Sequence, residues 1–177
     1  MKLNSQRLNL DYQPGEEIFT FPEETGLPFI FDVDEELTND SVAMDTVGLM
    51  LDSAERLAEL SKQSIKDSLE NSGHKYHELV RGFMDFHRED VGLSVAKSLF
   101  PDEDISLLSY EKMVDYLKLK RFGNILDEGQ QLFIIDLSFN PLITDELLVV
   151  YLNLNQEIVV QVKMLWNQQA NHTVLIK

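Results

Sequence analysis

Apolar and polar residues alternate along residues 132–166, and this pattern predicts three consecutive β-strands. Successive side chains point to opposite faces of a strand, so each run has one wholly apolar face and one mixed face. We expect the apolar faces to pack on the core. They consist of Phe133, Ile135, Leu137 and Phe139; then Leu148, Val150, Leu152 and Leu154; then Ile158, Val160, Val162, Met164 and Trp166.

The links between these runs are short, which predicts an antiparallel meander. Residues 140–146 join the first two runs and Asn155-Gln156 joins the last two, whereas a parallel return needs a crossover of about a dozen residues. Further strands are expected at residues 118–125, which open the same sheet through a turn at 127–129, and at residues 8–12, 18–21 and 28–34.

From Ser41 onward the apolar residues recur every three or four positions, the spacing of one helix face. The pattern predicts a helix from Ser41 to Gly73, capped by Asp40 or Ser41, with Gly48 splitting off a first turn and Gly73 ending the helix in the left-handed conformation. Further helices are expected at residues 74–90, 93–100 and 109–117. The first of these carries one apolar stripe, formed by Tyr76, Leu79, Val80, Phe83 and His87.

These elements predict an α+β fold, in which two longer and one or two short helices cover one face of an antiparallel meander sheet that also has short N-terminal strands. The 177 residues suit a single domain. We expect an acidic strand-rich segment at 1–40, a helical layer at 41–117, the sheet at 118–166 and a tail at 167–177.

The composition excludes some chemistry. The chain has no cysteine, which rules out disulfides and zinc sites built on thiolates. The first residues lack the apolar run of a signal peptide, and no stretch has the length and apolarity of a membrane span. The sequence therefore predicts a cytoplasmic protein.

Negative charge is concentrated near the N-terminus. The net charge is −16, and residues 1–40 hold ten acids against two bases. Such a surface repels nucleic-acid phosphates and anionic membranes and attracts a basic protein partner. Simple solubility is the alternative explanation. The candidate partner surface includes Glu23, Glu24, Asp32, Asp34, Glu35 and Glu36.

Two histidines are the candidates for a metal site. His74 and His77 lie three residues apart at a predicted helix start, and carboxylates from elsewhere would complete a site. His87 lies thirteen residues from His74, roughly 20 Å along a helix, which is too far to join them. The alternative is that both are ordinary surface or helix-terminus histidines. The acidic run 32–36 fails the calcium-loop pattern, because Leu37 and Ala43 replace its glycine and bidentate glutamate.

The mixed sheet face provides a second candidate surface. Leu132, Ile134, Val149 and Tyr151, with Val159, would form a sizeable apolar patch if nothing covered them. Exposed patches of this kind usually mark a partner surface or a dimer interface. The alternative is that the N-terminal strands or the tail cover this face.

Two segments carry a resemblance to a known family. Residues 134–136 and 144–151, preceded by the aromatic-rich segment 83–87 in a helical middle, resemble a bacterial domain of unknown function, number two thousand and four in its series. The resemblance spans about residues 29–165, and it departs from the family at Asn155-Gln156, where a glycine is usual. It implies a fold without an established activity. Some similar small acidic bacterial domains look like immunity proteins, which neutralise a toxin by binding it.

The sequence therefore favours a non-enzymatic, acidic bacterial-type binding protein, immunity- or inhibitor-like, that acts by protein–protein contact. It predicts no catalytic residues and no cofactor. One alternative is a metal-dependent hydrolase that uses His74, His77 and carboxylates. The other is a structural homodimer without a catalytic role.

Overall fold

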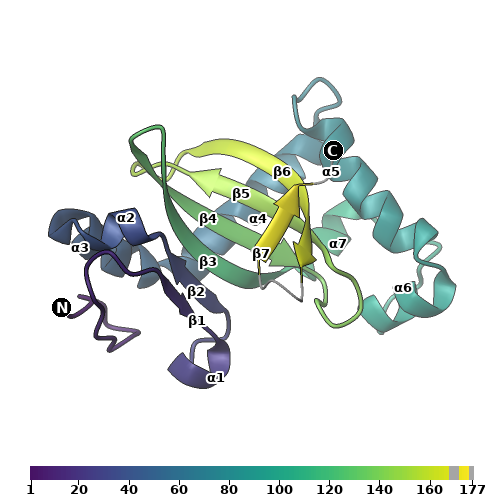
Figure 1. The fold of residues 1–177 in the computed structure, drawn as a ribbon. Helices are drawn as coiled ribbons and strands as arrows, with labels where there is room; N and C mark the ends of the chain where they lie inside the picture. The colour runs from purple at the N-terminus through teal and green to yellow at the C-terminus, as the bar shows by residue number, and fades with distance from the viewer. Residues whose placement is uncertain (168–171, 176–177) are drawn as a thin grey trace. The chain divides into compact units, whose positions relative to one another are not determined.

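The computed structural model describes residues 1–167 and 172–175, and the side chains of residues 1–165. It has an α+β fold with a mostly antiparallel sheet, which confirms the predicted fold class. The strands lie in the order β1-β2-β3-β4-β5-β6-β7 (Figure 1). They are β1 Ile18–Thr20, β2 Ile30–Val33, β3 Lys118–Asp127, β4 Gln130–Ser138, β5 Glu146–Leu152, β6 Ile158–Asn167 and β7 His172–Leu175.

Seven α-helices and one π-helical turn make up the helical part of the described chain. They are α1 Pro22–Thr25, α2 Glu35–Thr38, α3 Ser41–Leu51, α4 Ala54–Glu70, α5 His77–Asp85, the π-helical turn η1 Phe86–Asp90, α6 Leu93–Leu99 and α7 Tyr110–Asp115. Within the described residues, none of these helices is both long and apolar enough to cross a membrane.

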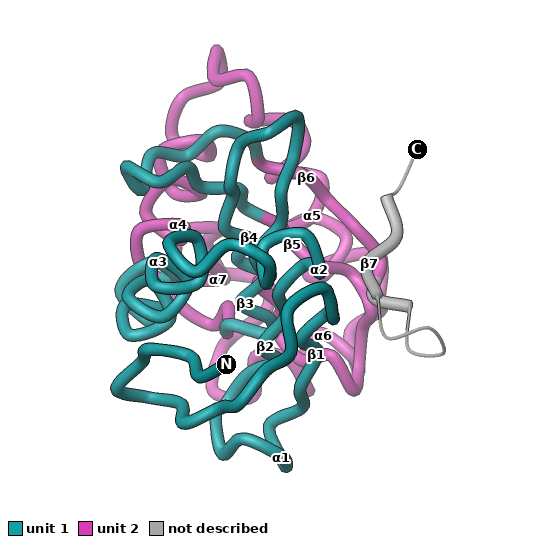
Figure 2. The backbone as a smooth tube through the Cα atoms, turned by 60° about the vertical axis from the view of Figure 1, so that its left-hand side comes forward, with its two compact units in different colours: residues 1–58, 119–136, 150–160 teal, residues 59–118, 137–149, 161–177 magenta. Residues whose placement is uncertain are grey.

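The chain forms two compact units, and each draws on several parts of the sequence (Figure 2). Unit 1 comprises residues 1–58, 119–136 and 150–160, and unit 2 comprises residues 59–118, 137–149 and 161–177. The core of unit 1 contains a stack of Phe31, Phe122 and Phe133, with successive ring centroids 6.4 and 6.2 Å apart. In unit 2, Phe139 packs against Phe83 and Phe100 at 5.5 and 4.9 Å.

One predicted strand does not form, and two predicted helices have different bounds in the structure. Residues 8–12 form no strand, because only an isolated bridge joins Lys2 to Asp11. The predicted helix 41–73 is two helices, and it ends at Glu70 without a left-handed Gly73. The helix expected from His74 begins at His77. Asp40 is the N-cap of α3, and its carboxylate accepts hydrogen bonds from the amides of residues 42 and 43.

The break between α3 and α4 lies at Asp52-Ser53 instead of Gly48, and the N-terminal segment is the physical reason. The Asp52 carboxylate accepts hydrogen bonds from the Ser5 hydroxyl at 2.6 Å and the Gln6 amide at 2.9 Å. Gly48 remains helical and allows this same segment to approach, because a Cβ there would stand 2.0 Å from the Asn4 carbonyl oxygen.

The predicted apolar face of β6 is also wrong. Gln161, on the face expected to be polar, is buried, and its amide nitrogen donates to the Ser64 hydroxyl at 2.7 Å. The Ser68 hydroxyl donates to the Gln161 carbonyl oxygen at 3.3 Å. The apolar residues Ile158, Val160, Val162 and Met164 are only half-buried, whereas the Trp166 side chain lies outside the described residues. The predicted tail contains β7, and residues 168–171 and 176–177 also lie outside the described residues.

Gly48 provides a test of this packing. We expect Gly48→Ala to lower the free energy of unfolding by about 1–3 kcal/mol, since the added methyl group overpacks the contact with Asn4. Urea denaturation measures the change.

Gly82→Ala is the matched control for the Gly48 variant. It lies within α5, and among the described residues no heavy atom outside its own helix backbone and chain neighbours lies within 4 Å of the added Cβ. The control should therefore gain about 0.5–1 kcal/mol. Equal effects of the two substitutions would contradict the close approach at Gly48.

Candidate functional site

An open hollow in unit 1 is lined almost entirely by acids. It has a volume of about 310 Å³, and its lining residues are Glu17, Asp32, Asp34, Glu35 and Ile125, which we call the acidic hollow. Glu17 precedes β1, Asp32 lies in β2, and Asp34 and Glu35 stand where β2 passes into α2. The structure therefore brings together three of the acids predicted for the partner surface.

Local structure explains how these acids are placed. Asp34 is the N-cap of α2, and its carboxylate accepts a hydrogen bond from the Glu36 amide at 2.9 Å, which is the usual role of an aspartate there. β2 pairs in parallel with β3, in the register that sets Asp32 beside Gly123. The absence of a side chain at Gly123 leaves room in this tight region, because a Cβ there would lie 3.2 Å from Ile134 Cβ.

Asp32 is the buried member of this lining. It is 8% exposed, and its Oδ2 accepts a hydrogen bond from Arg121 Nη1 at 2.7 Å. Arg121 Nε donates to Asp136 Oδ2 at 2.8 Å. We call these three residues the Arg121 bridge. It joins side chains from β2, β3 and β4 across neighbouring strands of the sheet.

The environment of Asp32 disfavours its charged form. Burial raises the pKa of Asp32 from 3.8 to about 6, the Arg121 guanidinium opposes this rise, and the carboxylates of Glu17 and Asp136 add to it. The ion pair with Arg121 therefore does not fully offset the burial of Asp32. A further positive charge in the hollow would favour ionised Asp32.

The other predicted surface acids are accessible. Glu23, Glu24, Glu35 and Glu36 are exposed, and Asp34 is half-buried. The Glu24 carboxylate accepts a hydrogen bond from the Phe21 amide at 2.7 Å, ahead of the short helix α1. Glu23, Glu24 and Glu36 do not line the hollow, so the structure gathers only part of the predicted acidic surface at this site.

The predicted apolar patch on the mixed sheet face is largely covered. Leu132, Ile134 and Val149 are 6%, 4% and 0% exposed, and Tyr151 is half-buried. Val159 is 38% exposed. The alternative, that this face is covered, therefore describes most of these residues, which leaves little continuous apolar surface for a dimer.

The two candidate metal ligands have local partners. The Tyr76 amide donates to His74 Nδ1 at 3.3 Å, and His77 Nδ1 lies 2.9 Å from the Ser68 carbonyl oxygen. His77 Nε2 is 3.9 Å from Glu78 Oε1. Among the side chains that the structure describes, those of residues 1–165, no group of three or more histidines and carboxylates is placed to hold a metal ion.

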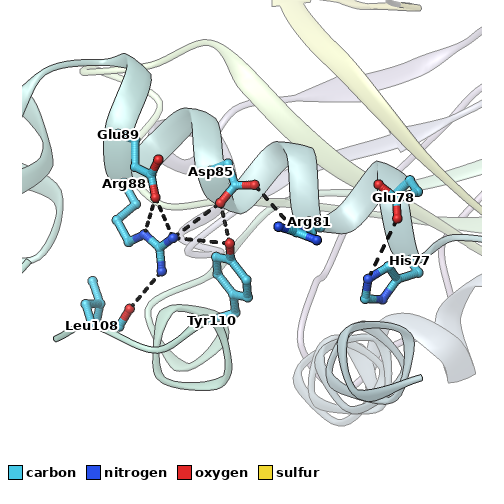
Figure 3. Close-up of polar contacts among 8 residues, drawn as sticks. All are labelled: His77, Glu78, Arg81, Asp85, Arg88, Glu89, Leu108 and Tyr110. Atoms are coloured by element: carbon cyan, nitrogen blue, oxygen red, sulfur yellow. Dashed lines mark hydrogen bonds and ion pairs between the residues drawn. The ribbon is translucent and has the colours of Figure 1, made fainter. Parts of the chain in front are cut away.

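A charged cluster farther along α5 and η1 is neutralised internally. Figure 3 shows Asp85 between Arg81 and Arg88, with the Tyr110 hydroxyl directed at the same carboxylate. The Arg88 guanidinium lies 4.5 Å from the centre of the Tyr110 ring and also donates to the Leu108 carbonyl oxygen at 3.2 Å. These contacts anchor η1 to the segment before α7, and they match two cations with nearby carboxylates.

His87, which the sequence placed in the apolar stripe of a helix, is the buried histidine. Its Nδ1 lies 2.8 Å from the Phe83 carbonyl oxygen and its Nε2 lies 3.0 Å from the Thr144 hydroxyl. The ring packs against Phe83 and Phe139 at 4.3 and 4.8 Å. Burial lowers the pKa of His87 to about 4, the Phe83 carbonyl opposes this, and Lys163 adds to it.

The raised pKa of Asp32 predicts that the free energy of unfolding depends on pH. Its pKa is higher in the folded protein, so its stabilising contribution is complete below about pH 4 and is lost as the pH rises to about 6. We expect the advantage of the native chain over Asp32→Asn to shrink by on the order of 3 kcal/mol across that range. Urea denaturation at a series of pH values measures it, and two parallel curves would refute it.

The lowered pKa of His87 predicts the opposite dependence of the free energy of unfolding on pH, over nearly the same pH range. Its pKa is lower in the folded protein, so its contribution is complete above about pH 6.5 and is lost as the pH falls to about 4. Relative to His87→Gln, the native chain should lose on the order of 3 kcal/mol on acidification. The same titration tests this. A difference between the two proteins that does not vary with pH would count against a buried neutral imidazole.

Comparisons with known proteins assign the chain to no family. No family model, no curated protein and no solved structure matches the chain. The resemblance carried by residues 134–136 and 144–151 therefore stays a prediction.

Proposed function

We propose that this chain is a binding protein that acts by contact with a basic protein partner, in the manner of an immunity-type inhibitor. The observation that carries the proposal is the acidic hollow, where four of the five lining residues are acids. A lysine or arginine side chain of the partner is the ligand whose charge and size suit such a site.

The electrostatics of the hollow support a cationic ligand over a neutral one. Arg121 is engaged by Asp32 and Asp136 beneath the hollow, while Glu17 and Glu35 are exposed at its rim. Entry of a cation would offset the repulsion that Glu17 exerts on Asp32. Binding should therefore weaken as salt screens the interaction.

The wider charge of the chain supports the same partner class. The net charge of −16 steers basic proteins toward the molecule and repels nucleic acid. The proposed place of action is the cytoplasm, and the partner's enzymatic activity, where it has one, would be blocked by occupancy alone. Such a role needs no catalytic group in this chain.

Charge reversal at the rim tests the proposal. The probe is a short peptide in which arginine alternates with valine and threonine, titrated calorimetrically into the purified chain. We expect Glu17→Lys with Glu35→Lys to weaken binding by about tenfold or more, because two attractive charges become repulsive. Neither side chain takes part in a hydrogen bond or ion pair recorded among the described residues, so the variant should fold.

The matched control reverses two exposed acids of unit 2, Glu70→Lys with Asp102→Lys. It changes the net charge by the same amount but leaves the lining of the acidic hollow unchanged, so it should bind the peptide within about twofold of the native chain at a salt concentration that screens general attraction. Equal loss in both double variants would reduce the binding to general charge attraction and overturn the proposal. Failure of the native chain to bind the peptide would do the same.

A further inference from the structure

β1 is an edge strand of the sheet. Among the described strands it pairs only with β2, antiparallel, through Ile18, Phe19 and Thr20. The outer side of an edge strand presents backbone N–H and C=O groups that are suited to pairing with another chain. The structure therefore has a sheet edge within the same unit that holds the acidic hollow.

A groove runs beside this edge. It has a volume of about 270 Å³ and is lined by residues 10–13 and 16–20. Residues 10–12 are held by the first residues of the chain, because the Leu3 amide donates to the Leu10 carbonyl at 2.9 Å and the Tyr12 amide donates to the Met1 carbonyl at 2.8 Å. Their backbone therefore pairs with residues 1–3 and not with β1.

The groove and the acidic hollow share one residue. Glu17 lines both, so a ligand that leaves the hollow at Glu17 enters the groove. Asp11 and Glu16 extend the acidic character along the groove, and both are exposed. Phe19 adds a half-buried ring, supported edge-to-face by Phe21 at 5.3 Å.

We propose that the outer edge of β1 receives an extended basic segment of the partner as an additional strand, with its cationic side chains against Asp11, Glu16 and Glu17. This inference rests on the proposed function and specifies how the partner binds. Strand addition obtains affinity from main-chain hydrogen bonds and specificity from alternate side chains. Basic residues at every second position of the partner would all point to one face of the added strand, where these acids could meet them.

The added strand must be short. β1 has three residues, which span about 10 Å, and the Phe21 amide is already bonded to the Glu24 carboxylate. The ladder therefore ends at Thr20. Because so few main-chain hydrogen bonds are available, charge must supply much of the specificity, and this favours a basic occupant over a second, equally acidic copy of this chain.

Backbone methylation of the probe tests the inference. The arginine–valine–threonine peptide is synthesised with a single N-methyl group at each position in turn, which removes one donor and leaves every charge in place. We expect the loss of affinity to alternate along the peptide, with about a tenfold loss at those positions whose amides face β1 and little loss at their neighbours. Hydrogen exchange should also slow at amides within residues 18–20 when the unmodified peptide binds.

Two outcomes separate this inference from the proposed function. If every methylated peptide binds as tightly as the unmodified one, yet Glu17→Lys with Glu35→Lys still abolishes binding, strand addition is wrong and the acidic hollow remains the site. If the unmodified peptide does not bind, or the rim variant leaves binding unchanged, the proposed function fails first. Protection of residues 18–20 together with the alternating loss supports both.

Discussion

The Arg121 bridge is the interaction on which the organisation of unit 1 depends. β2 and β3 are parallel neighbours that are far apart in the sequence, and Arg121 ties Asp32 on β2 to Asp136 on β4. A buried guanidinium is tolerated only when its donors are matched by acceptors, and its fork allows two carboxylates to bind at once. Loss of either acid would leave a buried charge without full compensation, at a cost of about 3–5 kcal/mol.

The same bridge also contributes a carboxylate to the acidic hollow, because Asp32 belongs to both. Arg121 holds the Asp32 carboxylate in place, and that carboxylate lines the acidic hollow together with those of Glu17, Asp34 and Glu35. The bridge thus connects the construction of the sheet with the proposed binding of a basic partner.

Local patterns in the sequence were sufficient to predict most of the strands, but not the contacts between distant segments. Alternation located β4, β5 and β6, and apolar spacing of three or four residues indicated helices in the region of α3 to α7, but α1 and α2 were not predicted. The buried state of Asp32 could not be predicted, because its partner Arg121 lies 89 residues away and the run 32–36 has the composition of a solvated turn. Gln161 was misassigned for a related reason, since its burial depends on Ser64 and Ser68. The spacing of apolar residues carries no information about hydrogen bonds between polar residues that are far apart in the sequence.

The histidines show the same limit. The spacing of His74 and His77 made them candidates for a metal site, yet each has a local hydrogen-bond partner. His87 lay in the predicted apolar stripe, which is a sign of burial, and the Thr144 hydroxyl that completes its hydrogen bonding lies 57 residues away. A position in an apolar stripe was the useful signal for the buried histidine, whereas spacing alone was not.

The acids around β1 protect the open edge of the sheet against pairing with another molecule of the same kind. An uncovered edge pairs readily with the edge of an identical molecule, and natural proteins commonly place charges there to prevent it. At β1 those charges are Asp11, Glu16 and Glu17, all of one sign, in a segment where acids outnumber bases by ten to two over residues 1–40. Two copies of this edge therefore repel each other, while an extended strand of opposite charge is attracted by the same groups. Protection against self-association and selection of a basic partner then require the same residues, so the edge can stay open without becoming a site of aggregation.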